Sequence, residues 1–183
     1  GLSRDDPDWY TALVADYILG GGSFASRLMD EVREKRGLAY GVSTSLVPYE
    51  SAPFMLASVG TRNESVAESI AVIRDEWRKF QSAGPTADEL EGAKMYITGS
   101  WPLRFTSSGS IASTLVAIQR SDLGLDYLDR RNDYINSITL KDVRRVTASL
   151  YKPDELSVIV VGQPVGVEST VRAGDPGVDS SGG

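Results

Sequence analysis

The chain has 183 residues, 41% hydrophobic and 24% charged, a balance typical of a globular domain. Its formal net charge of −6 argues against nucleic acid as the main partner. No apolar run approaches the ~20 residues that span a membrane, so we expect neither a nucleic acid nor a membrane as a partner. It contains no His and no Cys, which removes the commonest zinc ligands, the usual neutral-pH base, a thiol nucleophile and any disulfide that could indicate a compartment.

Two helices are predicted at the start of the chain, joined by a run of glycines. The first begins at Asp6 and Pro7, a capping residue followed by one that suits the first helical position, and it ends at Gly20–Gly22. The second begins near Ser23, carries apolar residues at helical spacing and ends at Gly37. Because glycine adopts positive φ at little cost, we interpret the glycine run as a hinge between the helices.

After Gly37 the hydrophobic period changes to two, which predicts a strand. One face of this strand is expected to carry Leu38, Tyr40, Val42, Thr44 and Leu46. A proline-rich turn then leads to a second strand over residues 54–60, which should pair with the first as an antiparallel hairpin. Near the end of the chain, residues 156–161 are apolar on both faces and predict a central strand of the sheet.

Helical patterns fill the chain between these strands. The first is capped by Asn63 or Ser65, the next opens with a capping box at Thr86, two cover residues 111–118 and 127–138, and the last opens at Thr139. Helices and strands in separate runs predict an α+β two-layer sandwich, a mainly antiparallel sheet with helices on one face. We assign residues 1–163 to this domain and residues 164–183, which contain few large apolar side chains, to a disordered tail.

Two catalytic interpretations of the early helices are weak. The glycine run precedes a helix, as a phosphate-binding loop does, but a helix precedes the glycines and no Lys-Ser or Lys-Thr follows them. Three carboxylates follow on the second helix, at Asp30, Glu31 and Glu34. Because Arg27 and Lys35 lie nearby, an ion-paired surface explains these carboxylates better than an acid–base pair does.

Arg33 and Tyr40 form a more promising pair. Arg33 lies in the last turn of the second helix and Tyr40 lies just inside the strand, so both can project into the corner where helix meets sheet. A guanidinium and a phenol suit the binding of peptide carbonyls or of a developing oxyanion. From the residues alone, however, structural roles are favoured, because a helix-end Arg complements the helix dipole and a strand Tyr commonly packs.

Several segments closely resemble the C-terminal half of pitrilysin/insulinase-family zinc peptidases. These segments are Gly1–Tyr10, Ile18–Gly22, Ser26–Leu28 and Glu31–Tyr40, with further likeness through residues 86–94, 138–146 and 156–162. The resemblance therefore covers residues 1–163 and implies one of the paired homologous α+β domains that enclose a chamber in that family.

The resemblance also implies a division of labour. In the family, the N-terminal half supplies zinc and the catalytic Glu through an inverted His-x-x-Glu-His motif. Since this chain has no His, we expect it to bind no metal and the zinc to lie in a partner domain or subunit. Arg33 and Tyr40 match the family's substrate-binding pair, and the Tyr40 hydroxyl would also stabilise the tetrahedral intermediate in trans. The implied function is the substrate-binding half of a zinc metalloendopeptidase, inactive without its zinc-bearing half.

Two alternatives remain open: a structural or assembly relative without peptidase activity, and a stand-alone peptide-binding module. Family halves of this kind usually begin with strands before the segment that matches Gly1–Asp8. We therefore expect a fragment whose exposed sheet edge could pair with another chain, as in a homodimer.

Overall fold

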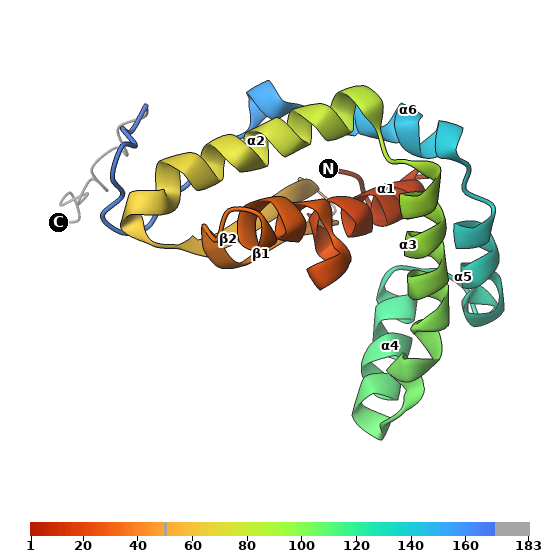
Figure 1. Cartoon of the computed structure of the whole chain (residues 1–183). Helices are drawn as coiled ribbons and strands as arrows, with labels where there is room; N and C mark the ends of the chain where they lie inside the picture. Colours follow the sequence, from red (N-terminus) through yellow and green to blue (C-terminus); the bar gives the residue numbers. More distant parts are fainter. Residues whose placement is uncertain (50, 171–183) are drawn as a thin grey trace, which may run out of the picture.

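A computed structural model describes residues 1–49 and 51–170 of the chain. Its helices are α1 (Trp9–Asp16), α2 (Val66–Ala83), α3 (Ala87–Gly99), α4 (Ser108–Arg120), α5 (Tyr127–Asn136) and α6 (Leu140–Leu150). Its strands are β1 (Ala39–Val47) and β2 (Phe54–Thr61). Figure 1 shows α2 running along the hairpin, while α3, α4 and α5 form a lobe that extends away from it. The α+β class is thus confirmed, with a small antiparallel sheet.

The tail predicted over residues 164–183 lies largely outside the described residues, and the domain boundary at residue 163 stays a prediction. None of the described helices is both long and apolar enough to cross a membrane.

Local sequence patterns predicted several helix ends correctly. Thr86 and Thr139 each form a capping box, with Glu89 and Asp142 respectively. Gly37 ends the second helix with φ of +60°, a value that favours glycine. These ends were predictable because each depends on residues only a few positions apart.

Two helix starts differ from the prediction. Helix α1 begins at Trp9 instead of Pro7, with Asp8 and not Asp6 at its N-cap. The Asp6 Oδ1 accepts a hydrogen bond of 2.7 Å from the Asp8 amide in the turn before the helix. The second helix is not continuous from Ser23: a short 3₁₀ turn ends at Ser26, which is extended with ψ of 152°, and the helix then resumes. Its last part, Met29–Glu34, is π-helical.

The hinge interpretation of the glycine run is wrong. None of Gly20–Gly22 has positive φ, and the first helix continues through a π-helical turn that ends at Gly21. The glycines are needed because other groups approach closely. A Cβ atom at Gly20 would lie 2.6 Å from the Thr44 Oγ1, and one at Gly22 would lie 2.6 Å from the Tyr17 carbonyl oxygen. Strand β1 therefore packs directly against the glycine backbone.

The hairpin pairs as predicted but contains a bulge at Tyr40. Ala39 pairs with Thr61 and Gly41 with Gly60, so Tyr40 is an extra residue without a partner in β2. The prediction that Tyr40 shares a face with Val42 is therefore wrong: Tyr40 is 88% exposed, whereas Val42 is buried. The bulge turns one aromatic side chain out of the regular alternation of the strand.

The predicted strand over residues 156–161 is also not observed. This segment forms neither a strand nor a bridge to another described residue, and Ile159 and Val161 are 90% and 95% exposed. An apolar pattern indicates burial, but a strand also requires a hydrogen-bonding neighbour, and the described sheet has two strands only, β1 and β2.

The hydrophobic core lies between α1, α2, α6 and the hairpin. Phe80 and Tyr151 are fully buried and their rings pack edge to face at 5.2 Å. Arg27 ties α3 to this core: its guanidinium binds the Glu89 carboxylate at 2.6 Å and lies over the Phe80 ring. The glycine run and the start of β1 are thus held on one side by a well-packed core.

Candidate functional site

Arg33 and Tyr40 do come together at the corner between helix and sheet. The Arg33 guanidinium carbon lies 5.3 Å from the centroid of the Tyr40 ring and 4.9 Å from that of Phe24. Both distances are typical of a cation–π contact. The arginine is therefore held between two exposed aromatic rings, and the sequence-based pairing of Arg33 with Tyr40 agrees with this geometry.

Three local features produce this arrangement. Positive φ at Gly37 turns the chain sharply from the π-helical segment into β1. The bulge then directs Tyr40 outward, toward the end of that helix. Ser23 has an unusual φ of +52°, and the residue that follows it is Phe24. Strained backbone of this kind is found at functional sites more often than elsewhere.

The corner borders a shallow concavity of about 350 Å³. Gly20, Gly21 and Ser43 form part of its lining, together with Phe24, Arg33 and Tyr40. The Tyr40 hydroxyl forms no hydrogen bond within the described part of the chain, and most of the ring is exposed. This hydroxyl can therefore donate to a ligand that lies along the glycine run.

The carboxylates next to this corner form surface ion pairs, as predicted, although Arg27 pairs with Glu89 and not with them. Lys35 contacts Asp30 at 2.7 Å and Glu31 at 2.6 Å, and Glu34 lies 3.6 Å from the Arg33 Nε. Hydrogen bonds from Lys35 and Arg36 lower the pKa of Glu31. Glu31 is thus held ionised, which does not suit a general acid.

Phe24 and Asp16 also belong to the candidate site, and the sequence analysis did not single them out. Asp16 is buried beside the glycine run, where a Cβ at Gly21 would lie 2.7 Å from its Oδ2, and its Oδ1 has no hydrogen-bond partner. Burial raises the pKa of Asp16 to about 6, although a hydrogen bond with the Thr44 side chain lowers this pKa in part. An acidic residue within an otherwise apolar helix was the one signal that could have identified Asp16.

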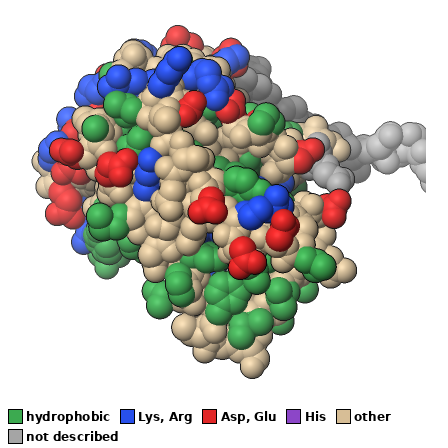
Figure 2. Space-filling view, turned by 90° about the vertical axis from the view of Figure 1, so that its right-hand side faces the viewer, with side chains coloured by type: hydrophobic (Ala, Val, Ile, Leu, Met, Phe, Trp, Pro, Cys, Tyr) green, Lys and Arg blue, Asp and Glu red, His purple; other side chains and the backbone are tan. Residues whose placement is uncertain are grey.

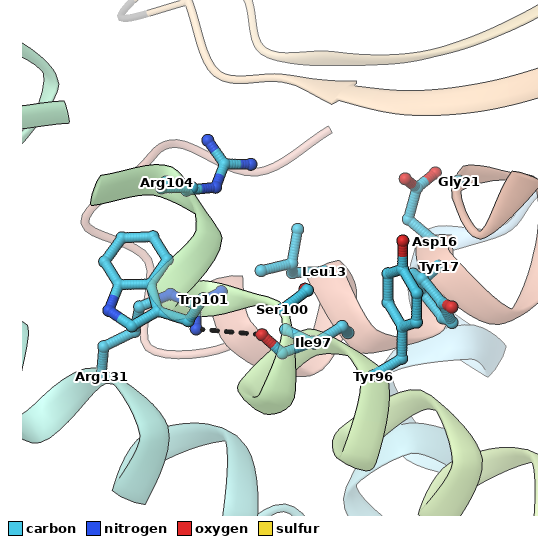
Figure 3. A pocket seen from close by; sticks show the side chains of 10 residues that line it. All are labelled: Leu13, Asp16, Tyr17, Gly21, Tyr96, Ile97, Ser100, Trp101, Arg104 and Arg131. Carbon is cyan, nitrogen blue, oxygen red and sulfur yellow. Dashed lines mark hydrogen bonds between the residues drawn. The ribbon is translucent and has the colours of Figure 1, made fainter. Parts of the chain in front are cut away.

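A second cavity, of about 280 Å³, adjoins this glycine run and shares Gly21 with the first. Figure 3 shows the Asp16 carboxylate at one end of this cavity and the Arg104 side chain at the other, with Leu13 between them. Near Asp16 the rings of Tyr17 and Tyr96 stack at 5.1 Å. This cavity extends the hollowed surface from Gly21, at the corner, past Leu13 and Asp16 of α1 to Arg104.

The described residues offer no site that fits zinc. No group of three or more Asp, Glu, His or Cys side chains lies close enough together there to hold a metal ion. The sequence has no imidazole or thiolate, the ligands that zinc prefers. The corner itself offers hydrogen-bond donors, the Arg33 guanidinium and the Tyr40 phenol.

Comparison with known proteins identifies the class. Residues 1–97 match the family described as the peptidase M16 inactive domain, and the chain belongs to that family. This confirms the resemblance found in the sequence. In M16 proteins this inactive domain is paired with a zinc-bearing peptidase half.

Particular relatives differ in the activity that their names state. A Streptomyces coelicolor protein named an uncharacterized zinc protease is 32% identical over 87% of this chain and 35% of its own length. A Helicobacter pylori protein named a non-peptidase homolog is 28% identical over 81% of this chain and 34% of its own length. The chain thus spans about a third of the length of these curated relatives.

Solved structures agree with the fold. The crystal structure of a peptidase M16 inactive domain from Pseudomonas fluorescens is 35% identical, with a TM-score of 0.74, covering 85% of this chain and 36% of that one. The inactive peptidase domain of a Bordetella parapertussis protein shows the same fold at 16% identity, with a TM-score of 0.67, covering 82% of this chain and 81% of that one.

Proposed function

We propose that this chain is the substrate-binding, non-metal half of a zinc metalloendopeptidase, and that the Arg33–Tyr40 corner holds the peptide. The observation that carries this proposal is the corner itself, where a cation and an exposed phenol face a shallow concavity beside the glycine run. A structural contact would not require a bulge that leaves Tyr40 almost fully exposed.

In this proposal each residue has a separate task. Arg33 donates hydrogen bonds to carbonyl oxygens of the bound peptide, and the rings of Phe24 and Tyr40 restrict its rotamers. The Tyr40 hydroxyl donates to the oxyanion that forms as the peptide bond is attacked. The zinc-bearing half supplies the hydrolytic chemistry, so the isolated chain is inactive.

The alternative is a structural or assembly subunit that keeps the fold without peptidase activity. It is favoured by the relative named a non-peptidase homolog. A homodimer is a second proposal, in which an edge of the two-stranded sheet or the exposed residues 156–161 pair with another copy of the chain. The substrate-binding function requires Arg33 and Tyr40, whereas a structural or assembly subunit does not.

Mixing the chain with a zinc-bearing M16 half, and measuring peptide cleavage, tests the proposal. We expect no cleavage by either half alone, cleavage by the mixture, and a loss of about a hundredfold or more when Arg33→Ala and Tyr40→Phe are combined. Tyr49→Phe is a matched control, because Tyr49 is also exposed but lies in the hairpin turn. Full cleavage with the double variant would refute the proposal in favour of a structural role.

A further inference from the structure

A third cavity, of about 360 Å³, continues the hollowed surface beyond that of Figure 3 and is lined by three arginines. Arg104 and Arg131 belong to both cavities, and Arg4 comes from the segment before α1. The three residues lie far apart in the sequence but surround one space between α1, α4 and α5. In a chain of net charge −6, such a concentration of cations requires an explanation.

No carboxylate in the described part of the chain pairs with these arginines. Within residues 1–49 and 51–170, no Asp or Glu oxygen lies within 4.0 Å of a guanidinium nitrogen of Arg4, Arg104 or Arg131. Arg131 is only 7% exposed, and burial lowers its pKa. Only neutral groups compensate the buried charge of Arg131 among the described residues, so an anion in the cavity would supply the counter-charge that the three arginines lack.

The three arginines are held to different degrees. Arg4 donates hydrogen bonds to the hydroxyls of Tyr10 at 3.1 Å and Tyr127 at 3.2 Å. Arg131 lies 4.0 Å from the Trp101 ring centroid, and its Nη1 donates to the Asn132 Oδ1 at 3.0 Å and to the Ile97 carbonyl oxygen at 3.4 Å (Figure 3). Arg104 is exposed and forms neither a hydrogen bond nor an ion pair with another described residue, so its whole guanidinium fork is available.

Most of the remaining wall of the cavity is apolar or aromatic and includes Leu13, Trp101, Ala117 and Ile118. The hydroxyl-bearing residues Ser113, Thr114 and Ser121 line the rest. One free guanidinium fork matches a carboxylate, which it can bind through two parallel hydrogen bonds, and the apolar wall suits a hydrocarbon or aromatic group next to that carboxylate. A ligand with both features is a peptide that ends in an apolar residue, or one with an acidic side chain beside an apolar residue.

We propose that this arginine-lined cavity binds a carboxylate of a peptide, with Arg104 as the direct ligand and Arg4 and Arg131 supplying fixed positive charge. The peptide nature of the ligand rests on the proposed function. The three cavities adjoin in turn: the first two share Gly21, and the second and third share Leu13 and Arg104. The distance from Tyr10 to Gly21 along the helical backbone corresponds to about five residues of extended peptide. A peptide held at the Arg33–Tyr40 corner can therefore reach the arginines.

Tryptophan fluorescence tests this proposal without any activity measurement. Trp9 and Trp101, two of the chain's three tryptophans, line the cavity, whereas Trp77 is buried in the core. The chain is titrated with an apolar hexapeptide that has either a free C-terminal carboxylate or a C-terminal amide, and with an amidated peptide that contains one Glu. Binding of the free acid identifies a C-terminal carboxylate, and binding of the Glu peptide identifies an acidic side chain.

We expect Arg104→Ala to weaken this binding about tenfold or more, because it removes a charge-assisted hydrogen-bond donor. Arg120→Ala is the matched control: it removes the same charge from the exposed end of α4, outside the cavity, and should leave binding unchanged. Arg33→Ala separates this proposal from the proposed function. It leaves the arginine-lined cavity intact, so it should not change the difference in binding between the acidic and the amidated peptides. If the amidated neutral peptide binds as well as the acids, if inorganic phosphate binds equally well, or if Arg104→Ala and Arg120→Ala have equal effects, the carboxylate site is refuted.

Discussion

The corner that carries Arg33 and Tyr40 and the lobe built around α4 are stabilised in different ways. At the corner, Leu19, Leu28 and Val32 are fully buried and the glycine backbone contacts β1 directly. By contrast, α4 has no buried residue, and its Val116 is 61% exposed. Figure 2 shows hydrophobic side chains gathered on the lower part of the surface, the end where α4 lies in Figure 1. Core packing therefore fixes the candidate site, whereas the lobe contributes surface.

The largest difference between the two regions should appear when a methyl group is added to a glycine. In Gly20→Ala the new Cβ would lie 2.6 Å from Thr44 Oγ1 and 2.9 Å from the Thr44 backbone nitrogen, so β1 must move. We expect a loss of about 3 kcal/mol in the free energy of unfolding, measured by urea denaturation.

Gly92→Ala provides the matched substitution in α3, where a Cβ meets nothing within 4 Å. There we expect a gain of about 0.5–1 kcal/mol, because alanine favours the helix. Equal effects at the two positions would show that close packing at the corner has been overestimated.

The signals that were predictable from the sequence are local ones. Capping boxes, the Gly37 turn and the hairpin depend on neighbouring residues, and the pairing of Arg33 with Tyr40 depends on a short connection. The bulge was not predictable, because the register at Tyr40 is set by Gly60 and Thr61 on the other strand. The close approach of Thr44 to Gly20 is equally non-local, and so is the meeting of Arg4, Arg104 and Arg131.

A smaller but pH-dependent effect is expected from Asp16, which lies beside Gly21 next to the corner. Burial raises its pKa from an ordinary value of 3.8 to about 6, so the folded state binds this proton more tightly than the unfolded state. The contribution of Asp16 to stability is therefore most favourable below about pH 4 and is lost as the pH rises to about 6.

Asp16→Asn removes this titration. At pH 7 we expect the variant to be more stable than the natural chain by about 2–3 kcal/mol, and near pH 4 we expect little difference. Urea denaturation at several pH values measures the stability difference between the two chains at pH 7 and near pH 4. Asp30→Asn is the control, because Asp30 is exposed and paired with Lys35. A stability difference that does not change between pH 4 and pH 7 would contradict the buried, protonatable state of Asp16.

The smallest effect is expected in the lobe. Val116→Ala in α4 removes two methyl groups that are mostly exposed, so we expect the free energy of unfolding to change by no more than about 0.5 kcal/mol. Thermal unfolding of Val116→Ala is compared with that of Val32→Ala, which changes a fully buried position at the corner. We expect Val32→Ala to cost about 2 kcal/mol or more. If Val116→Ala costs as much, another surface covers α4 and the contrast between the two regions fails.

The central claim, that Tyr40 contacts the reacting peptide bond, is tested most directly by the kinetics of Tyr40→Phe in the chain combined with a zinc-bearing half. This variant keeps the ring under Arg33 and removes only the hydroxyl. If the hydroxyl stabilises the oxyanion, kcat falls about a hundredfold while KM changes little. Unchanged kcat with a raised KM, or no change in either, would contradict the claim.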